Sequence, residues 1–257
     1  MKIKGLITLV ASSIALMTAS GAHANLQITY YTISPTDPDI NHLAGGSFNN
    51  EVQNALGPNG LPVLNTATFG CVSNCFTAAP LPTDVTAGGE LTWWSPTLNS
   101  HVTQTGTANI TLPFSVPSNF FPPNGTGSSD ANGYQAAVLS GTLNVPTTET
   151  VSFTIGADDA AFAFLDGTVV CDLGGVHGFS PGTCVTPFQI SAGAHTINVF
   201  FDDLNAVQSG LSFSVITQGV TTTPPPPPPS NGVPEPGSLA LFGITLIGLL
   251  ATRRKSV

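Results

Sequence analysis

Apolar and polar residues alternate in short runs along most of this chain, which is the pattern of strands that bury one face. The clearest run is 151–155, where Val, Phe and Ile alternate with Ser and Thr. A short helix is expected only at the start of residues 51–64, before Gly57 and Pro58. The chain is therefore predicted to be all-β, with strands at residues 26–33, 91–94, 108–114, 136–145, 151–155, 161–165, 169–173, 197–201 and 211–215.

Two hairpins are predicted in the second half of the chain. Asp166-Gly167 stands between the apolar runs 161–165 and 169–173. An Asp-Gly pair in this position predicts a type I′ turn, because that turn needs positive φ at both central residues. The strands at 197–201 and 211–215 are expected to form the second hairpin.

Each predicted hairpin carries two adjacent aspartates near a strand end, Asp158-Asp159 and Asp202-Asp203. Neighbouring side chains of an extended strand point to opposite faces, so a trans Asp-Asp pair does not aim both carboxylates at one ion. A cis peptide bond between the two would allow it. A bound Ca²⁺ takes about six to eight oxygen ligands, so carbonyls, an Asn and water would complete its shell.

The alternative interpretation is that these carboxylates cap turns by accepting backbone N–H bonds. Asp166 is assigned to its turn, and Asp202 is expected to be a charge on the rim of the site. The histidines at positions 42, 101, 177 and 195 are scattered, and each is interpreted as a polar or turn residue and not as a ligand.

The distribution of charge excludes several kinds of partner. The sequence has 14 acidic and 5 basic residues, and every Lys and Arg lies before Gly5 or after Thr252. The body therefore offers no Lys or Arg for salt bridges or phosphate clamps, or for the counterion release that drives nucleic-acid binding. No nucleic-acid partner is expected. An acidic field favours cations, although solubility and repulsion between copies explain the net charge alone.

Residues 1–24 have the three parts of a secretory signal peptide: a basic start, a short apolar core and the cleavage pattern Ala22-His23-Ala24. Asn25 is then the first mature residue, and an uncleaved anchor is the alternative. Export permits disulfides. Four cysteines allow three pairings, and a zinc site is the alternative to them. Local disulfides are preferred, Cys71–Cys75 and Cys171–Cys184.

The C-terminal part begins with a linker and ends in an apolar segment. Residues 220–232 include six consecutive prolines, which favour a stiff polyproline II rod. The apolar run at 237–252 is short for a transmembrane helix, and Arg254 and Lys255 would lengthen it by snorkelling. Basic residues directly after the run place that end in the cytoplasm, so the body lies outside.

Residues 233–257 join the tripeptide Pro234-Glu235-Pro236 to this apolar run and to a basic cluster that includes Arg253 and Arg254. The three-part arrangement resembles the PEP-CTERM sorting signal. The resemblance implies recognition by an exosortase, export across the inner membrane, a membrane-held C-terminal helix before processing, and delivery to the cell surface or an exopolysaccharide matrix. An ordinary single-pass anchor is the alternative.

The body, residues 25–219, carries a second set of motifs: Gly156-Ala157-Asp158-Asp159, Leu165-Asp166-Gly167, Gly174-Gly175-Val176-His177, Gly193-Ala194-His195, residues 54–63 and Trp93-Trp94. Together they resemble the fibro-slime domain and its relative, the protective-antigen-type domain. The resemblance implies a β-sandwich ectodomain.

In the sugar-binding members of the protective-antigen-type family, an Asp-Asp pair holds Ca²⁺ and the ion engages sugar hydroxyls. The resemblance places this pair at Asp158-Asp159, and it implies Asn205, then Asp203, as further ligands from the loop between the last two strands. Trp93 and Trp94 either stack on a sugar ring or form part of the core. The chain would then be an adhesin-like module that binds extracellular polysaccharide with Ca²⁺ as cofactor.

Two other functions compete with this one. A purely structural matrix protein would have neither a metal nor a sugar site. A glycoside hydrolase would use two carboxylates, one of them with a raised pKa. Because the sequence has no evident Ser-His-Asp, Cys-His or HExxH arrangement, the chain is not expected to be an enzyme.

Overall fold

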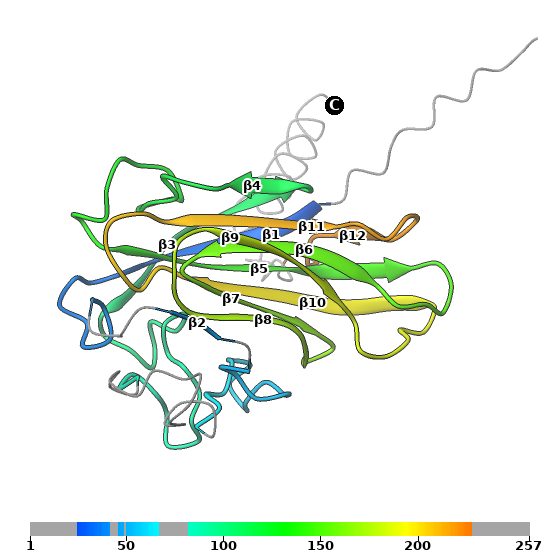
Figure 1. Ribbon diagram of the computed structural model, residues 1–257, viewed down its shortest axis with the longest axis horizontal. Helices are drawn as coiled ribbons and strands as arrows, with labels where there is room; N and C mark the ends of the chain where they lie inside the picture. The colour runs from blue at the N-terminus through cyan, green and yellow to red at the C-terminus, as the bar shows by residue number, and fades with distance from the viewer. Residues whose placement is uncertain (1–24, 42–45, 49, 67–81, 228–257) are drawn as a thin grey trace, which may run out of the picture. The chain divides into compact units, whose positions relative to one another are not determined.

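The computed structural model describes residues 25–41, 46–48, 50–66 and 82–227. Within these ranges the chain is all-β, and its strands form two antiparallel sheets (Figure 1). The larger sheet contains β1 (Asn25–Ile33), β2 (Gly46–Phe48), β3 (Val102–Thr111), β5 (Tyr134–Val145), β7 (Ala160–Leu165), β8 (Thr168–Val176), β10 (Gly193–Asp202) and β12 (Thr221–Thr223). The smaller sheet contains β4 (Phe114–Val116), β6 (Ser152–Asp158), β9 (Ser180–Val185) and β11 (Gly210–Val215).

The main core lies between the two sheets. Ile197, Val199 and Phe201 alternate along β10 and turn their side chains into this core. Phe153 and Phe213 face them from the smaller sheet, with their ring centroids 5.8 Å apart. The structure is thus a β-sandwich, as the sequence resemblance implies.

The opposite face of the larger sheet is buried as well. Phe162, Phe164 and Phe200 point away from the sandwich core into a second cluster. Residues from 33–64 and 85–102 contribute to this cluster, so loops form a layer over the face. Trp94 packs on Phe200 with ring centroids 5.1 Å apart. All six residues of β7 are buried, which explains its continuous apolar sequence, since a strand covered on both faces need not alternate.

The Asp166-Gly167 turn joins β7 to β8 as predicted, with φ values of 48° and 76°. The second predicted hairpin is wrong. Strand β10 pairs with β5 and β7, whereas β11 pairs with β4 and β6 in the other sheet. The chain between β10 and β11 therefore crosses from one sheet to the other.

Four local predictions also need correction. Residues 51–64 form no helix but an isolated bridge between Val52 and Leu64, because their apolar side chains pack against the sheet. Residues 91–94 contribute only an isolated bridge at Leu91. The strand expected at 108–114 is split between β3 and β4. Thr221–Thr223, expected in the linker, forms β12 and pairs with β5.

A compact unit ends at Pro224. In the described part of the chain, no helix is long and apolar enough to cross a membrane. The predicted signal peptide, the Cys71–Cys75 pair, His42 and the C-terminal segment from residue 233 lie outside the described residues.

Candidate functional site

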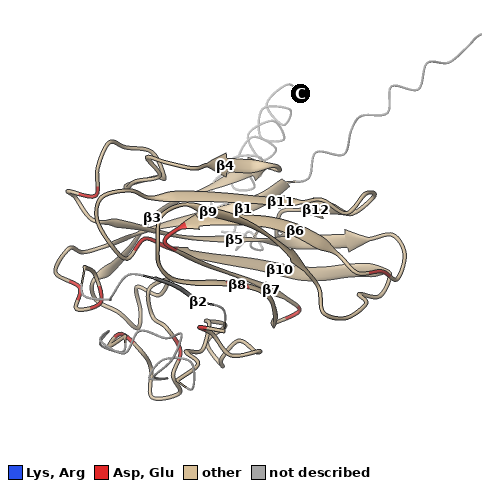
Figure 2. Cartoon of the chain, in the orientation of Figure 1, with Lys and Arg blue, Asp and Glu red and all other residues tan. Residues whose placement is uncertain are grey.

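The two aspartate pairs lie at two crossings between the sheets, and the strand pairing brings these crossings together. Asp158 ends β6 and pairs with Gly210 of β11. Ala160 begins β7 and pairs with Asp202 of β10. Strand β6 pairs with β11, and β7 pairs with β10. The crossing from β6 to β7 therefore runs beside the crossing from β10 to β11. Figure 2 shows acidic residues at several positions on the structure and no Lys or Arg among the described residues.

Asp158, Asp159 and Asn205 line one cavity of about 350 Å³. A cis peptide bond joins the two aspartates, and both residues are buried. His177, which follows β8, lines the same cavity. Val207 lies at its exposed margin, with 76% of its surface accessible. The cavity thus combines oxygen ligands, an imidazole and an apolar side chain.

Backbone hydrogen bonds hold Asp159 in place. Its Oδ1 accepts the His177 N–H at 2.9 Å, and its Oδ2 accepts the N–H groups of Leu204 at 2.8 Å and Asn205 at 2.9 Å. These bonds tie both crossings to the segment after β8. Asp159 therefore has the capping role that is the alternative to metal binding, and the same bonds fix the position of the loop that carries Asn205.

Burial makes the charge on these carboxylates unfavourable. It raises the pKa of Asp159 to about 7, with the Leu204 N–H opposing the shift and the charge of Asp158 adding to it. Burial also raises the pKa of Asp158, while the Phe179 N–H opposes this shift. Since the described residues include no Lys or Arg, no such side chain there offsets the two charges.

Asp203 lies close to the cavity but does not line it. It is fully buried, and among the described residues neither of its carboxylate oxygens has a hydrogen-bond partner. Burial, followed by the charges of Asp159 and Asp130, raises its pKa well above the usual range. Asp203 therefore places a further acid behind the pair at Asp158-Asp159.

Asp202 is not the rim charge that was expected. Its exposed fraction is 0%. It pairs with Ala136 and Ala160, which both belong to the core cluster on the outer face of the larger sheet. The residue pattern does not reveal that loops cover this face and enclose the side chain.

The tryptophans are core residues and lie away from the cavity. Trp93 Nε1 donates to Asp39 Oδ2 at 3.1 Å, and Trp94 Nε1 donates to the Phe201 carbonyl at 2.6 Å. Both side chains are buried, so they offer no platform for a sugar ring.

The predicted Cys171–Cys184 disulfide is present, with the Cα atoms 5.6 Å apart. It links β8 of the larger sheet to β9 of the smaller one. The turn assigned to Asp166 also forms, and its carboxylate accepts the Thr196 N–H at 2.8 Å.

His177 and Val207 are among the cavity residues that sequence reasoning missed. His177 closes the motif Gly174-Gly175-Val176-His177, and that position was the signal that could have placed it near the acid pair. Val207 has no such signal, because an isolated apolar residue in a polar loop resembles any exposed Val.

Residues 232–255 match the PEP-CTERM protein-sorting motif. The chain therefore carries the motif predicted from Pro234-Glu235-Pro236, and this motif implies sorting by an exosortase and export. Among curated proteins, none matches this chain in sequence.

Several solved structures share a distant likeness. The Epithelial Adhesin 9 A domain from Candida glabrata, solved in complex with Galβ1-4GlcNAc, is 12% identical with a TM-score of 0.38, over 77% of this chain and 85% of that domain. A PA14 sugar-binding domain from an RTX adhesin is 12% identical with a TM-score of 0.36, over 79% of this chain and 96% of that one. A β-glucosidase from Kluyveromyces marxianus is 14% identical with a TM-score of 0.27 over 34% of this chain, which spans 11% of that enzyme's length. Likenesses this distant decide nothing about the ligand of this chain.

Proposed function

We propose that this exported protein binds extracellular carbohydrate through a Ca²⁺ ion held by Asp158, Asp159 and Asn205. The observation that carries the proposal is that these three residues line one cavity. The sorting motif supports it, because an exosortase substrate is delivered to the cell envelope or its surroundings. Ca²⁺ sites of extracellular modules work at about 10⁻⁴–10⁻³ M, so a modest site suffices there.

The donor set fits a hard cation. The two carboxylates and the amide of Asn205 offer oxygen atoms, which Ca²⁺ prefers. Two buried carboxylates without a Lys or Arg partner among the described residues are costly to keep ionised. The raised pKa of Asp159, about 7, expresses this cost. A divalent cation would remove it, and the unpaired carboxylate of Asp203 adds to the negative field behind the site.

The cavity also provides what a sugar needs beside the ion. When bound, Ca²⁺ supplies positions that accept two neighbouring hydroxyl groups. Val207 offers an apolar surface for the C–H face of a sugar ring. We therefore infer a glycan with adjacent hydroxyls as the ligand class.

A thermal melt of the full chain tests whether the protein binds Ca²⁺. The chain is stripped with EDTA and titrated with Ca²⁺, and Mg²⁺ serves as the ion control. A ligand that binds the folded state alone adds about 2.7 kcal/mol of stability at 100 times its Kd. We expect a Ca²⁺-selective rise in Tm that Asp158→Asn/Asp159→Asn abolishes. Asp166→Asn is the matched control, since it removes an aspartate that does not line the cavity.

A glycan screen with and without Ca²⁺ then tests the carbohydrate. Retention that requires Ca²⁺ and is lost in the double variant supports the proposal. No Tm shift at millimolar Ca²⁺ contradicts it and favours a purely structural matrix role. Shortening of a bound oligosaccharide would instead identify a hydrolase.

A further inference from the structure

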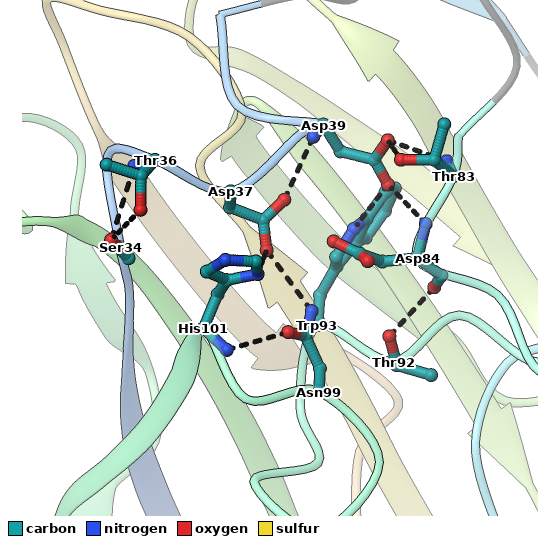
Figure 3. Close-up of polar contacts among 10 residues, drawn as sticks. All are labelled: Ser34, Thr36, Asp37, Asp39, Thr83, Asp84, Thr92, Trp93, Asn99 and His101. Carbon is teal, nitrogen blue, oxygen red and sulfur yellow. Dashed lines mark hydrogen bonds and ion pairs between the residues drawn. The ribbon is translucent and has the colours of Figure 1, made fainter.

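A second group of metal-ligating side chains lies in the loop layer over the larger sheet. Asp37, Asp84 and His101 each offer one ligand atom, and these atoms all lie within 4.8 Å of one another. Asp37 follows β1, His101 immediately precedes β3, and Asp84 belongs to the loop between them. Figure 3 shows the side chains of Asp84 and His101 turned toward the carboxylate of Asp37. None of these residues lines the cavity at Asp158-Asp159.

Asn99 positions two of the three ligands. Its Nδ2 donates to Asp37 Oδ2 at 3.1 Å, and its Oδ1 accepts the N–H of His101 at 2.8 Å. The His101 Nδ1 lies 3.8 Å from Asp37 Oδ2. This distance is too long for a hydrogen bond but suits two atoms that share one ion.

Asp39 positions the third ligand. Its Oδ1 accepts the N–H and the hydroxyl of Thr83 at 2.6 Å and 2.9 Å, and its Oδ2 accepts the Asp84 N–H at 3.1 Å. Trp93 Nε1 donates to the same oxygen. Asp39 is therefore fully bonded, and it holds the backbone from which the Asp84 side chain extends (Figure 3).

Three buried carboxylate oxygens in this region, one of Asp84 and both of Asp202, have no hydrogen-bond partner within the described residues. Asp84 Oδ2 is buried and has no hydrogen-bond partner among the described residues. Burial, followed by the neighbouring carboxylate of Asp37, raises the pKa of Asp84 to about 7. Asp202 is fully buried on the sheet face beneath the same loop layer, and both of its oxygens also lack partners within the described chain. Burial and the charges of Asp203 and Asp37 raise its pKa.

We propose that Asp37, Asp84 and His101 bind a divalent transition-metal ion of the Zn²⁺ class. The imidazole selects this class, because Ca²⁺ favours all-oxygen sites whereas a mixed set of imidazole and carboxylate suits Zn²⁺. The His101 side chain is 37% exposed, so the ion would enter from solvent. The bound ion would tie the segment after β1 to the loop that carries Trp93.

Co²⁺ is the probe, because its visible absorption reports coordination by nitrogen and oxygen. The full chain is stripped of metal, saturated with Ca²⁺ to fill the other proposed site, and titrated with Co²⁺. We expect one equivalent to bind and to be displaced by Zn²⁺ but not by more Ca²⁺. Asn99→Ala should weaken the affinity by about 10–100-fold, as loss of a ligand-orienting contact does.

Variants of the ligands identify the site. His101→Gln and Asp84→Asn should each weaken Co²⁺ binding by at least as much as Asn99→Ala. His195→Gln is the matched control, because His195 also lies beside a carboxylate, with its Nδ1 2.7 Å from Asp166 Oδ2, but has no second acid partner in the described part of the chain. It should leave the affinity unchanged.

The wild-type titration keeps the proposal falsifiable even if a variant unfolds. If Asp37 and Asp84 instead share a proton, the wild-type chain will show no Co²⁺ absorption band up to millimolar metal. That result overturns the proposal, as does a band that His101→Gln leaves unchanged in a folded variant.

Discussion

Asp159 Oδ2 accepts the backbone N–H of Leu204 at 2.8 Å, and this bond fastens one crossing between the sheets to the other. The same carboxylate belongs to the proposed Ca²⁺ site. Its protonation therefore affects the stability of the fold and the affinity for the ion together.

The stability of the metal-free protein should fall as pH rises from about 4 to 7. The pKa of Asp159 is raised from 3.8 to about 7, so the folded chain keeps a proton that the unfolded chain releases. Raising the pH through this window removes that proton and favours unfolding. Thermal melts in EDTA across this range measure the slope. Saturating Ca²⁺ should reduce the slope by the contribution of Asp159, and an equal slope with and without Ca²⁺ would contradict the assignment.

Glu51→Gln should stabilise the metal-free protein at pH 8 by about 1–3 kcal/mol. It removes the penalty of ionising a buried carboxyl group, about 1.4 kcal/mol per unit of pKa shift, and this gain exceeds the cost of leaving the Gln NH₂ group without a partner. Burial, followed by the charge of Asp172, raises the pKa of Glu51 to about 8. The ionised form therefore destabilises the folded state near and above that pH. Gln keeps an oxygen that can accept the Gly175 N–H now bonded to Glu51. Urea unfolding at pH 5 and pH 8 should show the gain at pH 8 and little at pH 5.

Glu90→Gln is the matched control for this prediction, with the opposite sign. Glu90 is equally buried, but its oxygens accept the backbone N–H of Asn59 at 2.7 Å and its Nδ2 at 2.6 Å. Replacing one acceptor oxygen with an NH₂ group breaks a charge-assisted bond. If Glu51→Gln destabilises the protein as much as Glu90→Gln does, then ionised Glu51 does not destabilise the fold.

Trp93→Phe should cost more stability than Trp94→Phe. Trp93 donates to the carboxylate of Asp39, whereas Trp94 donates to a neutral carbonyl. Hydrogen bonds to charged groups are worth about 1.5–3 kcal/mol, against about 0.5–1.5 kcal/mol for neutral pairs. Denaturant unfolding of both variants compares the two losses directly. Equal losses would mean that packing volume, and not the bond to Asp39, sets the cost.

Removal of the disulfide by Cys171→Ala/Cys184→Ala should lower the free energy of unfolding by about 2–4 kcal/mol. The two cysteines are 13 residues apart, and cross-linking so short a loop still restricts the unfolded chain. The loss should appear when denaturant unfolding of the variant is compared with that of the wild-type protein, both without a reductant. If the variant is as stable as the wild type, the bond does not constrain the unfolded chain.

The strands could be predicted from the sequence because each buries at least one face, which leaves a period of two. Their partners could not be predicted. Alternation in β10 and β11 is the same whether they pair with each other or lie in different sheets, so the chain order suggested a hairpin that does not form. Asp158-Asp159 was found because its signal is local, two adjacent residues in a motif.

The second proposed site had no such signal. Asp37, Asp84 and His101 come from three distant segments, and only the folded loop layer brings them together. The burial of Asp202 was missed for the same reason. Asp202 lies two residues after Phe200 and therefore on the same, outer face of the sheet. Nothing in the spacing of residues shows that loops cover that face.

The pairing of β12 with β5 determines which part of the β-sandwich bears a force applied to the chain beyond Pro224. Thr221–Thr223 pairs with β5 through a ladder of three residues, and Thr222 Oγ1 donates to the Asn25 carbonyl at 3.0 Å. A pull on the chain beyond Pro224 would load this short ladder before it reached β11. Strand β12 would detach first and lengthen the segment that follows the β-sandwich, while the strands around the cavity stayed paired.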